Sequence, residues 1–244
     1  MIVTGGSRGI GAATARLAAM RGYAVCINYV KDRSSAHKLV NEIEGAGGKA
    51  VAVTADVASE ADVVRLFETV DRKLGRVTAL VNNAGIVGLR QRVEDMSAGR
   101  IERMLAVNVT GSFLCAREAV KRMSTRHGGR GGAIINVSSV AARLGGPGDY
   151  VDYAASKGAI DTFTVGLARE VGAEGIRVNA VRPGVIRTEI HAASGDPERL
   201  ERIGATAPLK RPGEPEEIAR TILWLASDEA SYITGAIVDA SGGR

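Results

Sequence analysis

Short apolar runs that alternate with longer amphipathic segments are the feature that most constrains the fold of this chain. The apolar runs are nearly continuous and rich in β-branched residues, which is typical of strands buried on both faces of a parallel sheet. We predict such strands at 2–4, 24–29, 50–54, 79–82, 133–138, 177–181 and 236–239. Helical periodicity in the intervening segments predicts helices at 11–21, 34–46, 60–74, 99–123, 153–172 and 214–227.

The order of these elements predicts the topology of the sheet. Because strand–helix–strand crossovers are almost always right-handed, the alternation builds a doubly wound α/β sheet with helices on both faces. We expect about seven parallel strands in the order 3-2-1-4-5-6-7. The first strand looks clipped against a usual length of about five residues. No linker or repeat divides the 244 residues, so we predict one domain over 1–244 with an irregular substrate loop at about 186–212.

Composition and charge narrow the class of protein. The net charge of +5 allows an anionic partner, but no basic stripe is visible and aromatic residues make up only 4%, so we predict no nucleic-acid partner. Cys26 and Cys115 each lie in an apolar run, which predicts buried, reduced thiols rather than a disulfide or a metal site. No apolar stretch reaches membrane-spanning length and no signal peptide precedes the first motif, so we expect a soluble, cytoplasmic protein without a membrane partner.

A glycine-rich turn lies between the first predicted strand and the first predicted helix. It reads Thr-Gly-Gly-Ser-Arg-Gly-Ile-Gly over residues 4–11. Small residues in such a turn let the backbone approach a pyrophosphate held at the N-terminus of the following helix. The turn can serve chain reversal alone, but its place after a strand favours a dinucleotide-binding loop and a Rossmann-type fold. The residues expected to contact the cofactor here are Gly5, Ser7, Arg8, Gly9, Ile10 and Gly11.

The end of the second predicted strand bears on the choice of cofactor. In NAD-binding folds an acidic residue about 20 positions further on binds the ribose 2′-hydroxyl, whereas this strand ends at Tyr29 without a carboxylate. Arg8, with Lys31 or Arg33 just beyond the strand, can form a fork for a 2′-phosphate. The same residues can also be ordinary surface charges. We predict that NADP(H) is preferred and that NAD(H) is possible.

Polar and small residues also follow the third and fourth predicted strands. Asp56-Val57 ends the third strand, where a carboxylate can accept a hydrogen bond from the adenine amino group. Asn83, Ala84 and Gly85 follow the fourth strand, beside the expected path of the dinucleotide. Either group can be an Asx turn, but ligands of open α/β sheets bind at the carboxyl ends of the strands. We therefore assign these residues to the cofactor site.

The fifth predicted strand ends in two hydroxyl side chains, and a tyrosine and a lysine open the helix predicted at 153–172. Tyr153 and Lys157, at i and i+4, lie on one face of that helix. An adjacent ammonium lowers the pKa of a phenol, so Tyr153 can exchange a proton with a carbonyl or alcohol oxygen while a hydride moves. Ser139 can hold the same oxygen, although Ser138 competes for this role. Tyr-x3-Lys alone is common on helix surfaces, and its combination with the other motifs carries the prediction.

Together these motifs resemble the short-chain dehydrogenase/reductase family, of the compact type called classical, over essentially the whole chain. The resemblance implies an NAD(P)-dependent oxidoreductase that acts on CH–OH groups. The Ser-to-Tyr spacing is about one residue longer than in many relatives, so the loop between the two residues is expected to be remodelled. The matching features are Thr4-Gly5-x3-Gly9-x-Gly11, Asn82-Asn83-Ala84-Gly85, Asn108, Ser139, Tyr153-x3-Lys157 and Pro183-Gly184.

The resemblance also implies a role for each catalytic residue. Tyr153 would be the general acid/base, Lys157 would tune it and bind the nicotinamide ribose, and Ser139 would polarise the substrate oxygen. Asn108 would hold a water that links Lys157 to a proton relay. Such subunits usually form homotetramers through the helices that contain Asn108 and Tyr153. The residues implied to border the nicotinamide are Pro183, Gly184, Ile186 and Thr188.

The sequence leaves the substrate open. Arg90, Arg92, Arg143 and His191 lie in the predicted substrate segments, where they can bind an anionic substrate or face solvent. The main prediction is an NADP(H)-dependent oxidoreductase of a small-molecule ketone or secondary alcohol. One alternative is a 3-oxoacyl-[acyl-carrier-protein] reductase, for which the basic charge is weak support. Another is a catalytically silent nucleotide-binding protein, against which the intact catalytic motif counts.

Overall fold

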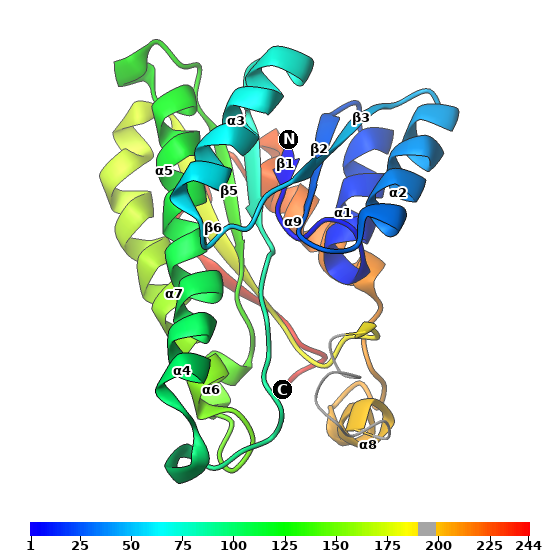
Figure 1. Ribbon diagram of the computed structural model, residues 1–244, viewed down its shortest axis with the longest axis vertical. Coiled ribbons are helices and arrows are strands. Elements are labelled where there is room, and N and C mark those ends of the chain that lie inside the picture. Colours follow the sequence, from blue (N-terminus) through cyan, green and yellow to red (C-terminus); the bar gives the residue numbers. More distant parts are fainter. Residues whose placement is uncertain (190–198) are drawn as a thin grey trace.

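The sheet of the computed structural model, which describes residues 1–189 and 199–244, contains seven strands (Figure 1). Their order is β3-β2-β1-β4-β5-β6-β7 and every neighbouring pair is parallel, so the predicted fold class and strand order are confirmed. The strands are β1 (Ile2–Val3), β2 (Ala24–Tyr29), β3 (Lys49–Thr54), β4 (Ala79–Asn82), β5 (Gly132–Val137), β6 (Ile176–Pro183) and β7 (Ile237–Ala240).

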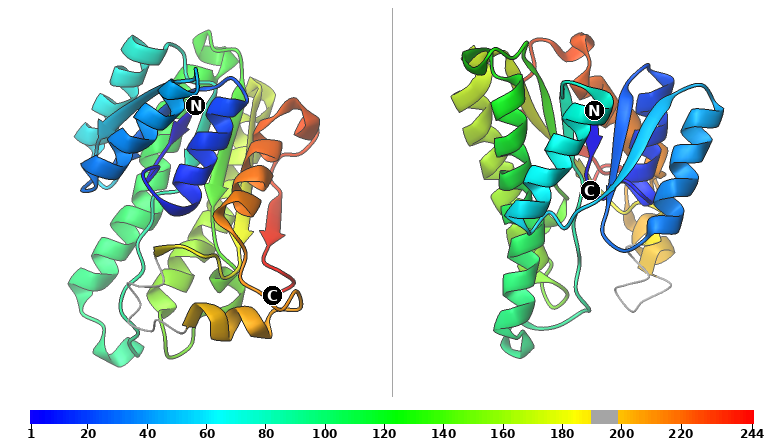
Figure 2. Two further views of the ribbon diagram at one scale, coloured as in Figure 1. Left: turned by 90° about the vertical axis from the view of Figure 1, so that its right-hand side faces the viewer. Right: turned by 45° about the horizontal axis from the view of Figure 1, so that its top comes forward.

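Helices cover both faces of the sheet, as Figures 1 and 2 show. One face is covered by α1 (Gly9–Met20), α2 (Arg33–Gly45) and α9 (Pro215–Ala226). The opposite face is covered by α3 (Glu60–Leu74), α5 (Gly111–Met123) and α7 (Val151–Val171). Three shorter helices lie toward the carboxyl edge of the sheet (Figure 1), namely α4 (Ala98–Leu105), α6 (Ala141–Leu144) and α8 (Arg199–Thr206).

Two predicted segments differ from the structure. The helix predicted at 99–123 is divided, because the π turn η2 (Ala106–Thr110) joins α4 to α5 and widens one helical turn. The segment 186–212, predicted to be irregular, contains the helix α8. The amphipathic pattern of this helix is interrupted by Gly204, and prolines follow the helix closely. His191 and its neighbours in 190–198 lie outside the described residues.

The core has two layers because successive strand residues point to opposite faces of the sheet. Ile135 packs into the layer beneath α1 and α9, whereas Ile134 packs into the layer beneath α3 and α5. Cys26 and Cys115 are buried, as predicted, and burial raises the pKa of each thiol to about 12. Within the described ranges, no cluster of side chains could hold a metal ion, and no helix is long and apolar enough to cross a membrane.

The strand order places a crevice at the carboxyl edge of the sheet. β1 pairs with β2 on one side and with β4 on the other, so the chain reverses its direction of winding at β1. Connections that follow β1 and β4 leave toward opposite faces, and ligands of doubly wound sheets bind at such a switch point. The fold therefore gathers the loops after β1, β4 and β5 at one edge.

We expect Phe67→Ala to destabilise the protein by about 3–5 kcal/mol, because removing a buried aromatic ring leaves a cavity. The Phe67 side chain is fully buried between α3 and the sheet. Chemical denaturation followed by circular dichroism measures the loss. Met20→Ala, at an exposed position of α1, is the control and should change the free energy of unfolding by less than about 0.5 kcal/mol. Equal effects of the two substitutions would contradict the assigned core.

Candidate active site

The glycine-rich loop after β1 has no room for side chains. Gly5 and Gly9 have φ angles of +59° and +53°, in the left-handed region that favours glycine. A Cβ at Gly11 would lie 2.4 Å from the Gly5 carbonyl oxygen and 2.6 Å from the Asn83 amide nitrogen. The loop leads into the N-terminus of α1, where the unpaired N–H groups of the first turn favour binding of an anion. This cradle fits a pyrophosphate at the predicted position.

Side chains from the neighbouring strands hold this loop in place. The Asn83 amide donates to the carbonyl oxygens of Thr4 (2.8 Å) and Gly5 (3.0 Å). The Thr4 hydroxyl accepts from the backbone N–H groups of Asn83 (2.9 Å) and Ala84 (3.0 Å). Asn83, predicted as a cofactor contact, therefore uses its side chain to shape the loop and leaves its backbone at the crevice.

Asn28, near the end of β2, is a site residue that the sequence analysis missed. Its side-chain oxygen accepts from the Gly5 N–H (3.2 Å), and its side-chain nitrogen donates to the Ala55 carbonyl (2.9 Å). Asn28 is almost completely buried in an otherwise apolar strand. A polar residue inside an apolar run was the available signal, because buried amides are nearly always hydrogen-bonded.

Cationic residues surround the region where a ribose phosphate is predicted. β2 ends at the buried Tyr29, and the nearby carboxylate of Asp32 caps α2 by accepting from the Ser35 N–H (2.9 Å). Arg33 lies exposed at the start of α2, and Arg8 is exposed and paired with Glu189 (3.1 Å). A hollow of about 660 Å³ opens beside the glycine loop, lined in part by Ser7, Arg8, Gly9, Ser35, Lys38, Thr188 and Glu189.

Asp56, predicted to contact adenine, forms an Asx turn after β3. One carboxylate oxygen accepts from the Ala58 N–H (3.0 Å) and the other accepts from the Arg103 guanidinium (2.9 Å). Val57 is buried and packs against Gly111, where a Cβ would approach it to 2.7 Å. Both residues lie at the carboxyl edge of the sheet, and the Asp56 side chain already has partners there.

Ser139, Tyr153 and Lys157 come together where β5 ends and α7 begins. A hydrogen bond joins the Tyr153 side chain to Ser139, whose hydroxyl oxygen also accepts from the Ala141 N–H (3.1 Å). The Lys157 ammonium lies 5.6 Å from the centroid of the Tyr153 ring and donates to the Val137 carbonyl (2.7 Å). Ser138, the competing serine, is buried and its hydroxyl donates to the Lys157 carbonyl (3.2 Å) instead.

Burial controls the protonation of this pair. It raises the pKa of Tyr153 to about 12, with the hydrogen bond to Ser139 acting in the opposite direction. It lowers the pKa of Lys157 to about 8, and Asp161 acts against that shift. The prediction that the ammonium lowers the phenol pKa is therefore wrong for this structure, because burial is the largest cause of the shift and raises the pKa of Tyr153. The Tyr153 hydroxyl therefore keeps its proton at pH 7.

Asn108 lies in the π turn and joins two parts of the site. Its side-chain nitrogen donates to the Ile86 carbonyl (3.0 Å) and to the Ser156 hydroxyl (3.0 Å), and its oxygen accepts from the Ile86 N–H (2.8 Å). Gly85 lies beside it, and a Cβ there would lie 3.4 Å from the Asn108 oxygen and 3.6 Å from the Lys157 nitrogen. The side chain of Asn108 thus fixes the segment after β4 against α7.

The segment after β6 closes the crevice from the other side. Gly184 lies against Ser241, where a Cβ would meet the carbonyl oxygen at 2.6 Å. Thr188 packs against Gly9, 3.1 Å from the place of a Cβ, so the segment that follows β6 meets the glycine loop. Pro183, Gly184, Ile186 and Thr188 thus lie in one segment, which contacts the glycine loop at Thr188.

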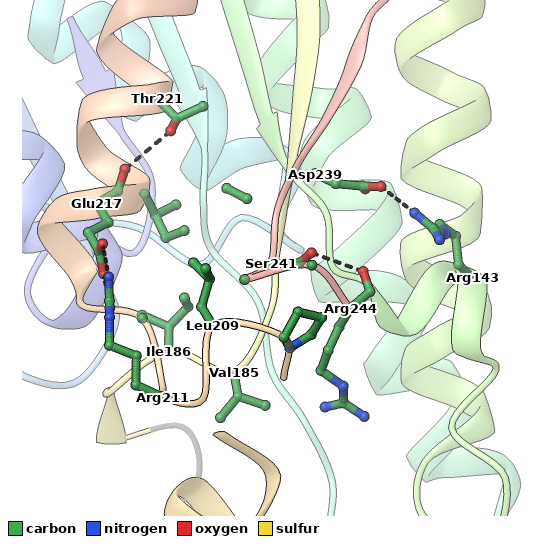
Figure 3. Close-up of a pocket in the computed structure, with 16 residues that line it drawn as sticks. Arg143, Val185, Ile186, Leu209, Arg211, Glu217, Thr221, Asp239, Ser241 and Arg244 are labelled. Atoms are coloured by element: carbon green, nitrogen blue, oxygen red, sulfur yellow. Dashed lines mark hydrogen bonds and ion pairs between the residues drawn. The ribbon is translucent and has the colours of Figure 1, made fainter. Parts of the chain in front are cut away.

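Carboxylates pair with the arginines that were candidates for an anionic substrate. Arg90 bonds to Asp149 (2.6 Å) and Arg92 bonds to Glu94 (2.6 Å). Arg143 pairs with Asp239 at a second hollow, of about 590 Å³, which Figure 3 shows. Ser139, Tyr153 and Lys157 are not among the residues that line this second hollow.

Comparisons with known proteins find relatives that match nearly the whole chain. The family model described as enoyl-(acyl carrier protein) reductase matches residues 5–244. The chain is 56% identical to the uncharacterized oxidoreductase YgfF of Escherichia coli, over 100% of this chain and 98% of that protein. It is 41% identical to a 3-oxoacyl-[acyl-carrier-protein] reductase of Synechocystis, over 99% of this chain and 95% of that protein.

Solved structures with the same fold include two close neighbours. A mutant of the Serratia marcescens short-chain dehydrogenase/reductase is 36% identical, with a TM-score of 0.91 over 99% of this chain and 96% of that chain. A blue fluorescent protein from a metagenomic library, in complex with NADPH, is 38% identical, with a TM-score of 0.90 over 99% of this chain and 96% of that chain.

We expect Gly11→Ala to weaken NADPH binding by at least about tenfold, because the new methyl group forces the loop away from its cradle. Fluorescence titration with NADPH measures the dissociation constant. Gly45→Ala, at the end of α2 with open space around the glycine, is the matched control and should bind NADPH as the wild type does. Wild-type affinity in Gly11→Ala would show that the loop does not hold the dinucleotide.

Proposed function

The chain belongs to the short-chain dehydrogenase/reductase family and is an oxidoreductase acting on CH–OH or carbonyl groups, and from this premise we propose that it is NADP(H)-dependent, with Tyr153 as general acid/base. The substrate would be a ketone or the corresponding secondary alcohol. The observation that carries the proposal is the convergence of Ser139, Tyr153 and Lys157 at the carboxyl end of β5, across the crevice from the glycine loop.

The proposed mechanism follows from the protonation of these side chains. The bound nicotinamide supplies or accepts the hydride. The Tyr153 hydroxyl, protonated at neutral pH, donates its proton to the substrate oxygen during reduction and takes it back during oxidation. Ser139 holds that oxygen by a hydrogen bond, and Lys157 binds the ribose hydroxyls and stabilises the phenolate. Asn108 would hold the water of a relay that returns a proton to Tyr153.

Three observations support a preference for NADP(H). β2 ends at Tyr29 rather than at a carboxylate, and Asp32 already caps α2. Arg8 and Arg33 lie nearby, and guanidinium groups suit a 2′-phosphate. A solved neighbour is a complex with NADPH. NAD(H) would bind more weakly, because it lacks the phosphate that these cations neutralise.

A homotetramer is also part of the proposal. Phe113 on α5 is 48% exposed and stacks on Phe163 of α7, with ring centroids 3.8 Å apart. A stacked aromatic pair with one exposed ring, on two adjacent helices, is the kind of apolar surface that subunits cover. The pair lies on the helices that flank Asn108 and Tyr153, where the resemblance implies subunit contacts.

The reduction of 3-oxoacyl groups on an acyl carrier protein is the second candidate function. The relative of that name from Synechocystis and the net charge of +5 favour it. Arg90 and Arg92 do not favour it, because each already pairs with a carboxylate of this chain. Activity on a carrier-bound ketoester that falls steeply with added salt would support this function over small-molecule reduction.

We expect Tyr153→Phe to lower kcat by at least about 100-fold on any carbonyl that the wild type reduces, because it removes the donated proton. The assay is a panel of ketones and ketoesters, run with NADPH and with NADH, and NADPH binding should be retained. Tyr232→Phe, at a fully exposed tyrosine, is the control.

Near-normal kcat in Tyr153→Phe would refute the mechanism, and NADPH binding without turnover of any carbonyl would favour a silent nucleotide-binding protein. Equal kcat/KM with both cofactors would refute the preference.

We also expect kcat/KM for carbonyl reduction to fall as the pH rises through about 8. Lys157 is charged below its lowered pKa and neutral above it, so its ammonium is present at neutral pH and is lost in mild alkali. Tyr153, with a pKa raised to about 12, keeps its proton over the same range and does not cause the fall. Initial rates across neutral to alkaline pH at saturating NADPH test this. A flat profile through pH 8 would contradict the role of the Lys157 charge.

A further inference from the structure

A buried ion pair lies directly beside the catalytic tyrosine. The Arg100 guanidinium on α4 donates to both oxygens of Asp152, through Nε (2.8 Å) and Nη2 (3.2 Å). The two side chains are 16% and 3% exposed. Asp152 immediately precedes Tyr153 in the first turn of α7. The pair therefore joins α4 to the turn of the helix that carries the proton donor.

The same guanidinium shapes the segment that follows β4. Its Nη1 donates to the Leu89 carbonyl (2.8 Å) and to the Gln91 side-chain oxygen (2.8 Å). Gly88 packs against it, since a Cβ there would lie only 2.7 Å from the Arg100 Cζ. The segment 86–92 borders the crevice, and the planar guanidinium fixes it by several bonds at once.

Asn108, two helical turns after Arg100, contacts the same two parts of the structure. It binds Ile86 at the start of the same segment and Ser156 on α7. Asp152 and Ser156, one turn apart on α7, lie on either side of Tyr153 in the sequence. Through Arg100 and Asn108, the helical stretch from α4 to η2 thus contacts both the segment 86–92 and the start of α7, at two points each.

Asp152 remains ionised in spite of its burial. Burial by itself would raise the pKa of the carboxyl, but the bonds from Arg100 and from the Tyr153 N–H outweigh it and hold the pKa below its ordinary value. Because a buried charge without its partner is strongly unfavourable, the two side chains constrain each other's position.

We propose that Arg100 and Asp152 are positioning residues for hydride transfer, which couple the crevice segment 86–92 to the orientation of Tyr153. Neither side chain transfers a proton. The pair holds the wall of the crevice and the Tyr153 hydroxyl in one arrangement, so that a substrate oxygen placed against the wall meets the donor. This inference rests on the oxidoreductase function proposed above.

The first test is Arg100→Lys, which keeps the charge and loses the planar, multiple bonding. We expect kcat to fall about 10- to 100-fold, because small misplacements of a donor have effects of this size. The KM for NADPH should stay unchanged, since Arg100 does not contact the glycine loop. Asp152→Asn should lower kcat in the same way. The double variant should lower kcat by a smaller factor than the product of the two single-variant factors.

Arg122→Lys is the matched control for a purely structural effect. Arg122 is 18% exposed and pairs with Glu118, which is 5% exposed, on α5 away from the site. This variant should lower the melting temperature as Arg100→Lys does, while kcat stays at the wild-type value. If Arg100→Lys lowered kcat no more than Arg122→Lys, the positioning role would be refuted.

If Arg100→Lys does not fold, Gly88→Ala replaces it as the test variant, because Gly88 lies in a loop at the crevice. Its methyl group would displace the Arg100 guanidinium, and kcat should again fall. Amide hydrogen exchange measured by mass spectrometry gives a readout without turnover. Gly88→Ala should raise exchange both in 86–92 and in 151–156, whereas Arg122→Lys should change neither segment. Faster exchange in 86–92 alone would overturn the coupling, and a wild type without turnover would refute only the proposed function.

Discussion

The parallel pairing of β1, β4 and β5 is the constraint on which the whole site depends. Val3 pairs with Val81, and Asn82 pairs with Asn136, so the three strands end at nearly the same level. The glycine loop, the segment after β4 and Ser139 each begin within a residue or two of these ends. A shift of one residue in either pairing would move a loop by about 3.3 Å and turn its side chains to the other face. Hydrogen bonds between adjacent loops can form only in this register.

Several polar groups are buried to hold this arrangement. The Asn82 side chain donates to Asn136 (3.0 Å), which donates to Thr164 of α7 (2.9 Å), so a chain of bonds crosses from β4 to the catalytic helix. Within the described residues, the side-chain oxygen of Asn82 and one carboxylate oxygen of Asp161 lack a hydrogen-bond partner. Such groups are unfavourable for stability. Asn82 lies at the end of β4, and Asp161 lies on α7 one helical turn after Lys157.

The sequence predicted the parts of this protein that depend on local pattern. The strand predicted at 24–29 and the helix predicted at 60–74 have the observed bounds, because apolar periodicity and end signals lie within those segments. The resemblance brought the glycine loop, Ser139 and Tyr153-x3-Lys157 into one site for the same reason, since each motif is short and follows a strand.

Features that depend on contacts distant in the sequence could not be predicted in this way. Arg100 and Asp152 are 52 positions apart, and nothing in either local pattern indicates a pair. The raised pKa of Tyr153 needed knowledge of its burial, which the spacing to Lys157 does not contain. Likewise, the π turn at 106–110 depends on Asn108 facing inward to Ile86 and Ser156, whereas the sequence reads as an uninterrupted helix.

The hydrogen bonds of Asn108 bear on the relay that we propose. Its nitrogen has two donor positions, occupied by Ile86 and Ser156, and its oxygen accepts from the Ile86 N–H. The backbone carbonyl of Asn108 accepts from the Ser112 hydroxyl (3.2 Å), and a carbonyl oxygen has two lone pairs. The side-chain oxygen likewise has two lone pairs and uses one of them, so a relay water would bind either this oxygen or the backbone carbonyl of Asn108. In either case the π turn matters for the proposed relay, because it carries both oxygens of Asn108 while the side-chain nitrogen bonds to Ile86 and Ser156.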